Sequence, residues 1–293
     1  TPRKLPEGGV GDCSNSLSLK TLRDAASLKD SMVGIESLLV VGGGYIGLEV
    51  ASSARRMGIE VSIVEKANRI LGRVAAEETS SYLKSLHESM GVEIFESADV
   101  TDFSVDSSGM VKEVEINGLI NKGVDHVVIG IGVIPNDSLA KQAGLDVDDG
   151  ILVDHYCRTS DDSVYAIGDC AKFYYNGECI RLESVQNAIE QAEVAAMNIC
   201  GIPSKYDTVP WFWSDQFGAK LQIAGLSRGY DQVIVSEEKG FSAWYFNDGR
   251  LLSVDVVNSP ATFMLAKKLL KDKVAVSPSD VTNLKALKAK ALS

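Results

Sequence analysis

The sequence is poor in the residues that build metal centres and disulfide frameworks. Its 293 residues include five cysteines and three histidines, with no C-x-x-C pair. The cysteines are scattered along the chain at Cys13, Cys157, Cys170, Cys179 and Cys200, and the histidines at His87, His126 and His155. Scattered cysteines are typical of a reducing compartment, so we expect a cytoplasmic protein with no metal site. Each histidine is expected to be a surface or packing residue.

Long apolar runs are also missing. No run approaches the ~20 residues that cross a bilayer, and the N-terminal TPRKLPEGGVGD lacks the apolar core of a signal peptide. We therefore expect no membrane association. The formal net charge of −11 argues against a general nucleic-acid binder. The 45% of hydrophobic residues is ordinary for a globular protein, and the length indicates about two domains.

Positive charge is concentrated at the C-terminus. Residues 260–293 contain seven lysines against two aspartates, a net +5. The lysines are Lys267, Lys268, Lys271, Lys273, Lys285, Lys288 and Lys290. This pattern indicates either a solvated helical face or a docking edge for an acidic partner protein.

A glycine-rich turn stands out in LLVVGGGYIGLEVASSARRMGIEVSIVE, residues 38–65. The apolar run at its start predicts a buried strand, and a helix and a second strand follow the glycines. Gly42, Gly44 and Gly47 match G-x-G-x-x-G: the first allows a tight turn, the second lets a pyrophosphate approach, and the third lets helix and strand pack closely. The helix N-terminus then favours the phosphates. The whole unit predicts a dinucleotide site.

The acid at the end of the second strand selects the dinucleotide. Glu65 can accept hydrogen bonds from the ribose 2′-hydroxyl and would repel a 2′-phosphate, so NAD is favoured over NADP. Lys66 and Arg69 follow closely and weaken this preference without reversing it.

The remaining patterns outline an α/β region followed by a smaller antiparallel α+β region, with the change near 202–209. Helices are expected at 22–32, 75–90, 183–199, 260–270 and 278–287, and strands at 92–95, 100–105, 111–116, 124–133, 151–154 and 164–169. Further strands are expected in LQIAGL, QVIVSE, FSAWYF and LLSVDVV, with a hairpin turn at NDG.

A second signal is VYAIGDCA, where Asp169 follows an expected buried strand and can accept hydrogen bonds from a sugar-like hydroxyl. Alone it is an ordinary strand end. Together with the glycine turn, it resembles the flavin-binding segment of the FAD-dependent pyridine-nucleotide oxidoreductases, which ends in [YF]-A-x-G-D and begins with a threonine, here Thr159. The strings TPRKLP, GIGVIPN, RLESVQNAIEQ, VPWFWSDQF and FNDGRLLSVDVVNSPATFMLAKKLL further resemble the bacterial ferredoxin and rubredoxin reductase branch, with PWFWSDQ the most specific.

This resemblance implies an NADH-dependent flavoenzyme that passes electrons through FAD to a ferredoxin or rubredoxin. It implies an NAD site formed by Gly42, Gly44, Tyr45, Ile46, Gly47, Glu65 and Gly132, and FAD contacts from Asp169, the Val185 backbone and Trp213. Glu49 would lie toward the nicotinamide, although an acid in the first turn of a helix is also favoured by the helix dipole. Trp211 and Phe212 are expected to be core aromatic residues.

The implied fold is a Rossmann-like NAD-binding domain with part of an FAD-binding domain and an α+β interface domain. The expected boundaries are 1–12 for the end of a linker, 13–150 for the NAD-binding domain, 151–205 for the FAD-binding part and 206–293 for the C-terminal domain. Family members carry another G-x-G-x-x-G unit for FAD before the point where this sequence opens. A shortened chain, a separate N-terminal polypeptide that completes the FAD site, or a degenerate NAD-binding protein would each explain this. We favour the first two and expect the chain alone to bind NADH but to hold FAD poorly.

Three alternatives remain. A disulfide reductase or NADH oxidase on the same fold is disfavoured because no cysteine pair has the right spacing and no histidine follows His155. A monodehydroascorbate reductase shares GGGYIGLE but differs in its C-terminal segment. A non-catalytic NAD-binding interaction protein would bind the dinucleotide without turnover.

Overall fold

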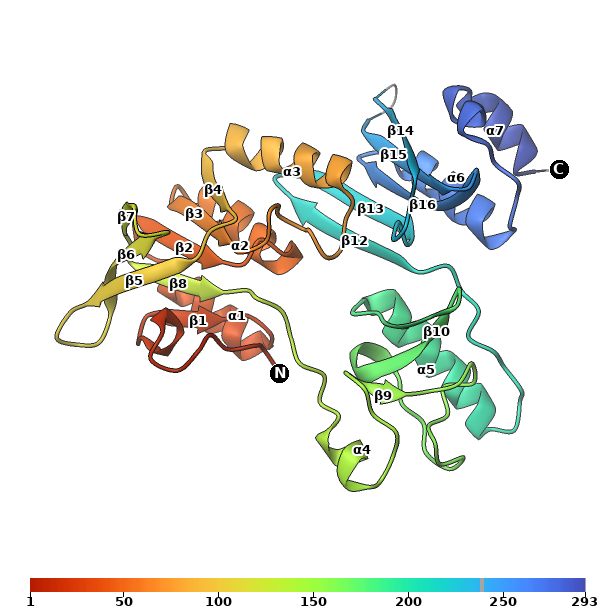
Figure 1. The fold of residues 1–293 in the computed structure, drawn as a ribbon, viewed down its shortest axis with the longest axis horizontal. Helices are drawn as coiled ribbons and strands as arrows, with labels where there is room; N and C mark the ends of the chain where they lie inside the picture. Colours follow the sequence, from red (N-terminus) through yellow and green to blue (C-terminus); the bar gives the residue numbers. More distant parts are fainter. Residues whose placement is uncertain (238–239, 293) are drawn as a thin grey trace. The chain divides into compact units, whose positions relative to one another are not determined.

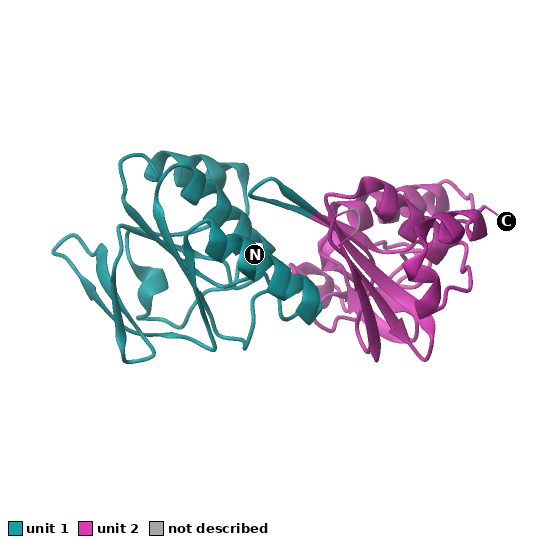
Figure 2. Ribbon diagram, turned by 90° about the horizontal axis from the view of Figure 1, so that it is seen from above, with its two compact units in different colours: residues 1–133, 214–220 teal, residues 134–213, 221–293 magenta. Residues whose placement is uncertain are grey.

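A computed structural model describes residues 1–237 and 240–292, and their contacts divide the chain into two compact units. Unit 1 comprises Thr1–Val133 together with Ser214–Lys220, and unit 2 comprises Ile134–Trp213 and Leu221–Ser293 (Figure 2). Unit 1 therefore includes a short segment from much later in the chain, and this segment contributes to the candidate site.

Unit 1 is built around a parallel five-stranded sheet with the order β1-β8-β2-β3-β4 (Figure 1). Its strands are β1 (Ser16–Ser18), β2 (Ser37–Val41), β3 (Glu60–Glu65), β4 (Val92–Glu96) and β8 (His126–Ile129). The elements between them include η1 (Val10–Asp12), α1 (Leu22–Ser31), α2 (Tyr45–Arg56) and α3 (Glu77–Ser89). Strand β2 is the middle strand and is buried from Leu38 to Val41, which explains its continuous apolar run.

Local signals account for the helix ends of unit 1. Thr21 and Asp24 form a capping box at the start of α1, in which each side chain accepts the backbone N–H of the other residue. Helix α2 ends just before Gly58, whose φ of +87° is in the left-handed region that glycine adopts without strain.

A three-stranded antiparallel sheet also belongs to unit 1. It consists of β5 (Val100–Val105), β6 (Val111–Ile116) and β7 (Ile120–Gly123). Asn117 and Gly118 form the turn between β6 and β7 with φ values of +53° and +70°, as a tight hairpin requires. Val111, Val114 and Ile116 of β6 pack with residues of the parallel sheet in one hydrophobic cluster.

Unit 2 begins with a small α/β arrangement. Its elements are α4 (Ser138–Gln142), β9 (Ile151–Leu152), η2 (Gly168–Cys170), β10 (Ala171–Tyr175), β11 (Glu178–Arg181) and α5 (Val185–Ile199). The strands form a sheet in the order β11-β10-β9. Ser184 caps α5, because its hydroxyl accepts the backbone N–H of Asn187 at 3.2 Å.

The rest of unit 2 is a five-stranded antiparallel sheet with helices, in the order β12-β13-β16-β15-β14. The elements are β12 (Trp211–Gln216), β13 (Ala219–Gly225), β14 (Gln232–Ser236), β15 (Ser242–Asn247), β16 (Arg250–Val257), α6 (Pro260–Lys271), η3 (Pro278–Thr282) and α7 (Leu284–Lys290). Trp244 and Phe246 of β15 are fully buried against Phe263 and Leu269 of α6. The β12–β13 hairpin starts and finishes in unit 2, but its closed end, Ser214–Lys220, belongs to unit 1.

The predicted fold class is confirmed, since a parallel α/β sheet precedes an antiparallel sheet with helices. Two element predictions were wrong. The run at 164–169 is not a strand: it makes one isolated bridge, from Tyr165 to Arg158, and Asp169 lies in η2. The expected helix at 278–287 is divided into η3 and α7 at Asn283. The predicted four-part domain boundaries stay a prediction.

Candidate functional site

The glycine turn after β2 has strict steric requirements at two positions. Gly42 has a φ of +111°, and a Cβ there would lie 2.6 Å from the carbonyl oxygen of Gly130. A Cβ on Gly47 would lie 2.2 Å from the carbonyl oxygen of Gly42. Both glycines are therefore required by the chain itself, for the turn and for the packing of α2 on β2.

Gly44 has no such internal reason to be glycine. Its φ is −79°, which any residue can adopt, and the nearest atom to a Cβ there would be the Gly130 carbonyl oxygen at 4.0 Å. It stands at the N-terminal cap of α2, where the first backbone N–H groups have no partner within the helix. The open space beside Gly44 fits a pyrophosphate that approaches the helix N-terminus, so this turn suits a dinucleotide. Ile46, in the same first turn, is 44% exposed.

Glu65 lies at the carboxyl end of β3 and holds the glycine turn. Its Oε2 accepts the backbone N–H of Gly43 at 2.7 Å, and its Oε1 accepts that of Ala67 at 2.7 Å. Each carboxylate oxygen keeps a second lone pair, which a ribose hydroxyl can use. Its two basic neighbours are engaged elsewhere: Lys66 forms an ion pair with Asp99, and Arg69 donates to the Ala75 carbonyl. This arrangement fits NAD.

Gly132 lies just beyond the end of β8, the strand next to β2. Its φ is +101°, and a Cβ there would lie 3.1 Å from Nη2 of Arg73. Because the sheet is parallel, the turn after β2, Glu65 at the end of β3 and the loop after β8 share its carboxyl edge. Ligands of open parallel sheets bind at this edge.

Glu49 is half-buried on α2 and belongs to a chain of polar side chains. It is the fifth residue of α2 and not, as expected, an acid of the first turn. The Ser214 hydroxyl donates to its Oε1 at 2.5 Å. Nε2 of Gln216 donates to the Ser214 hydroxyl at 3.0 Å, and Nε2 of His87 lies 2.9 Å from Oε1 of Gln216. Burial raises the pKa of Glu49, and the hydrogen bond from Ser214 partly offsets that rise.

Sequence reasoning did not find the partners of Glu49. Ser214 and Gln216 lie in the PWFWSDQ string, which was recognised as specific without a role for these two residues. His87 was expected to be a surface or packing residue. Ser214 is 165 residues from Glu49 in sequence, and no local pattern connects them.

The residues expected to contact FAD all lie in unit 2, and two of them are close together. Gly168, just before Asp169, donates its backbone N–H to Gln191 of α5 at 2.8 Å, and a Cβ on Gly168 would lie 3.4 Å from that of Ala188. This packing places η2 against the first turns of α5. Val185 is the first residue of α5 and is 56% exposed, so its backbone N–H lies at an accessible helix N-terminus.

Trp213 is the third predicted FAD contact and lies on β12. Its ring centroid is 5.5 Å from that of Trp211. The Trp211 backbone N–H lies 3.3 Å from Oε1 of Gln186, which places this part of β12 beside the N-terminal turn of α5. Trp211, expected to be a core residue, is only partly buried and packs against the hydrophobic cluster of the antiparallel sheet. The η2 turn with Asp169 and the strand with Trp213 thus both lie beside α5, the helix that begins at Val185.

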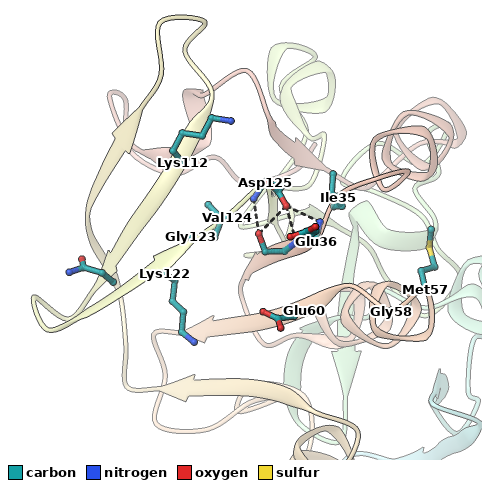
Figure 3. A pocket seen from close by; sticks show the side chains of 12 residues that line it. Ile35, Glu36, Met57, Gly58, Glu60, Lys112, Lys122, Gly123, Val124 and Asp125 are labelled. Carbon is teal, nitrogen blue, oxygen red and sulfur yellow. Dashed lines mark hydrogen bonds between the residues drawn. The ribbon is translucent and has the colours of Figure 1, made fainter.

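A wide depression of about 740 Å³ lies elsewhere, at the amino ends of β2 and β3 (Figure 3). Its lining includes Glu36, Glu60 and Asp125, and the Asp125 carboxylate accepts the backbone N–H groups of Glu36 and Ser37. This is the edge of the parallel sheet opposite to the glycine turn, so the depression is not part of the dinucleotide site.

Neither a metal centre nor a membrane span is found in the described part of the chain. In residues 1–237 and 240–292, no three or more His, Cys, Asp or Glu side chains are grouped to hold a metal ion. Within the same ranges, no helix combines the length and the apolar character needed to cross a bilayer.

Comparison with known proteins identifies the family. Residues 1–197 match the family described as pyridine nucleotide-disulphide oxidoreductase, and residues 211–290 match the one described as reductase C-terminal. The chain belongs to the pyridine nucleotide-disulphide oxidoreductases. The prediction of an FAD-dependent enzyme of this family, with FAD and NAD as cofactors, is thereby confirmed.

The similar proteins include reductases named for putidaredoxin and for rhodocoxin. Putidaredoxin reductase CamA of Pseudomonas putida is 39% identical over 286 residues, which cover 95% of this chain and 68% of that protein. Rhodocoxin reductase of Rhodococcus erythropolis is 42% identical over 270 residues, covering 90% and 63%. The crystal structure of a covalent putidaredoxin reductase–putidaredoxin complex matches with a TM-score of 0.93 and 38% identity, covering 100% of this chain and 73% of the other. The chain thus spans about two thirds of the two curated reductases.

Proposed function

We propose that this chain is part of an NADH-dependent reductase that passes electrons through FAD to a ferredoxin or rubredoxin. The similarity over 95% of the chain to a putidaredoxin reductase carries the proposal. A second support is the fold match to a reductase in complex with its iron–sulfur partner. The cytoplasmic location predicted from the scattered cysteines is part of the same proposal.

The residues of unit 1 are proposed to bind and orient NADH. The turn at Gly44 and the N-terminus of α2 would take the pyrophosphate, with Tyr45 and Ile46 in the first turn. Glu65 would accept the adenosine ribose hydroxyls, and Gly132 would leave room for the dinucleotide beyond β8. Glu49, one turn further along α2, would lie toward the nicotinamide.

The residues of unit 2 are proposed to hold the flavin. Asp169 and the backbone N–H of Val185 would bind the polar chain of FAD, and the Trp213 ring would lie against the isoalloxazine. Bound FAD would supply hydride acceptance from NADH and one-electron release to a partner, a chemistry that the protein side chains cannot supply. The earlier FAD unit expected from the resemblance, on this or another polypeptide, stays a prediction.

Two of the five cysteines, Cys157 and Cys170, are unsuited to a dithiol mechanism. Burial raises the pKa of the Cys157 thiol to about 12, and burial also raises the pKa of Cys170, next to Asp169. A reactive cysteine needs a thiolate, which is stabilised by a lowered pKa. These two thiols therefore suit packing rather than disulfide exchange.

The test is an NADH titration of the chain followed by reduction assays with FAD supplied. We expect saturable NADH binding, weaker NADPH binding, and NADH-dependent reduction of a [2Fe–2S] ferredoxin once the FAD site is complete. An intact mass and a visible spectrum of the purified protein would show whether a second polypeptide and flavin are present. Binding of NADH without reduction of ferredoxin or ferricyanide, even with FAD and the N-terminal unit supplied, would instead favour a non-catalytic NAD-binding protein.

A further inference from the structure

A buried chain of side chains leads away from Glu49 into unit 1. Ser214 and Gln216 are at most 1% exposed, and His87 on α3 is fully buried. Three contacts connect them in series, from His87 to Gln216 at 2.9 Å, from Gln216 to Ser214 at 3.0 Å, and from Ser214 to Glu49 at 2.5 Å. All four residues belong to unit 1.

Every hydrogen bond in this chain has the same direction. The Gln216 amide donates to the Ser214 hydroxyl, so the proton of that hydroxyl is available to Glu49. The same amide orientation presents Oε1 to His87, which must then carry its proton on Nε2. The chain therefore begins at the Nε2–H of a neutral imidazole and ends at a carboxylate. Hydrogen bonds aligned in this way polarise and strengthen one another.

Stability alone does not account for His87. Its Nδ1 is buried and has no hydrogen-bond partner among residues 1–237 and 240–292, and leaving such a group unsatisfied costs about 1–3 kcal/mol. Apolar side chains at positions 87 and 216 together would avoid that cost. Nor is the chain the only anchor of the hairpin end, because the Phe217 backbone N–H donates to the Ser52 hydroxyl at 2.7 Å. The Phe217 ring also packs edge-on against the His87 ring, with centroids 4.8 Å apart.

We propose that His87 is a positioning residue for Glu49: through Gln216 and Ser214 it directs a one-way series of donors at the Glu49 carboxylate and fixes that carboxylate as an acceptor. This inference rests on the proposed function only in placing Glu49 beside the nicotinamide. The chain would then set the orientation in which Glu49 meets the dinucleotide, although His87 does not itself reach it. Asp215 acts on Glu49 in two opposite ways, because its backbone N–H donates a hydrogen bond to the Glu49 carboxylate while its negative charge opposes a second negative charge there.

The test compares substitutions of the hydrogen-bonded residues, made in the full 293-residue polypeptide. His87→Leu removes the first donor, and His87→Gln restores an N–H at the position of Nε2. His126→Leu is the matched control, because His126 also has a buried Nδ1 with no partner in the described part of the protein, but lies on β8 outside the hydrogen-bonded series. With only three histidines in the sequence, the imidazole ¹⁵N signals can be assigned by these variants.

The first readout needs no cofactor. We expect His87 to be the neutral Nε2–H tautomer, and its Nε2 signal to shift in Glu49→Gln and in Ser214→Ala while the His126 signal does not. An Nδ1–H tautomer, or an Nε2 signal unchanged in both variants, would overturn the proposal. A purely structural histidine would not respond to a substitution three hydrogen bonds away.

The second readout is the affinity for NADH. We expect His87→Leu to weaken binding about 3- to 10-fold, the size of one hydrogen bond, with His87→Gln and His126→Leu close to the parent. The effect of His87→Leu should disappear in the Glu49→Gln background. If His87→Leu weakens NADH binding as much in the Glu49→Gln background as in the parent, His87 does not act through Glu49. If the parent protein does not bind NADH but the ¹⁵N coupling is present, the proposed function is wrong, while the hydrogen-bonded series from His87 to Glu49 is confirmed.

Discussion

The Glu65 carboxylate accepts the backbone N–H of Gly43 at 2.7 Å, so one side chain both holds the glycine turn and marks the proposed ribose position. Its direct neighbour across the sheet is Glu96 on β4, which in the same way accepts a backbone N–H, that of Ile70 at 2.8 Å. Each of the two glutamates thus holds a loop by accepting a backbone N–H, but only Glu65 lies next to the glycine turn.

This pair gives a test of cofactor choice. We expect Glu65→Gln to weaken NADH binding about tenfold and to reduce the preference over NADPH, because a neutral amide neither pairs both ribose hydroxyls nor repels a phosphate. Dissociation constants for both cofactors check this. Glu96→Gln is the control and should leave the NADH-to-NADPH ratio unchanged. Equal ratios in Glu65→Gln and the parent would rule out the role of Glu65 in selection.

Gly44 and Gly47 separate binding from folding. A methyl group on Gly44 meets no protein atom closer than 4.0 Å, so Gly44→Ala should fold with parental stability but bind NADH at least about tenfold more weakly, since the methyl group occupies the pyrophosphate space. A methyl group on Gly47 would lie 2.2 Å from the Gly42 carbonyl oxygen, so Gly47→Ala should lose about 2 kcal/mol or more of unfolding free energy.

Urea denaturation and NADH titration of both glycine variants provide the measurements. Parental NADH affinity in Gly44→Ala would show that no pyrophosphate approaches this turn. A stable Gly47→Ala would show that α2 can move away from β2 without cost.

The buried His87 predicts how stability depends on pH. Burial lowers its pKa below the ordinary 6.5, because the imidazolium is poorly solvated there. The unfolded chain then binds more protons than the folded one below about pH 6.5, so stability falls as the pH drops through that value and toward the folded-state pKa. We expect the unfolding free energy to decrease between about pH 7.5 and 5.5, and to decrease less in His87→Gln.

Equilibrium urea unfolding at three pH values measures this difference. His155→Gln removes an exposed histidine outside the chain and serves as the control. The same pH dependence in His87→Gln and in the parent would contradict a neutral, buried His87 in the folded state.

The structure reduces the lysines worth testing for partner docking at the basic C-terminus to two. Lys290 forms an ion pair with Asp280 at 2.9 Å, and Lys268 one with Asp272 at 2.6 Å, so both contribute to local structure. Lys285 and Lys288 on α7 are exposed and make no ion pair among the described residues. Reversing these two to Glu should raise the KM for an acidic ferredoxin several-fold at low salt and flatten its salt dependence.

Reversal of Lys4 and Lys29, two exposed lysines of unit 1, changes the net charge equally and is the control. Steady-state kinetics at low and high ionic strength distinguish a local docking surface from a general charge effect. If both pairs change KM alike, α7 is not the docking surface.

The turn and strand elements of the proposed NAD site could be predicted from the sequence because their signals are local. The strand, the three glycines, α2 and Glu65 follow each other within 28 residues, and each carries a backbone requirement that can be read without knowing the rest of the fold. The wrong strand before Asp169 shows the limit of such reading. A short apolar run such as VYAI does not reveal whether a neighbouring strand will pair with it.

The amino-acid sequence by itself determined the α/β class, the glycine turn and the acid that follows it, since these depend on steric limits and hydrogen bonds between near neighbours. Only the tertiary structure decided what surrounds Glu49. A hairpin end from residues 214–220 joins unit 1 and brings Ser214 and Gln216 between α2 and His87 of α3. Contacts between residues so distant in the chain arise from the packing of whole elements, which periodicity along one segment does not encode.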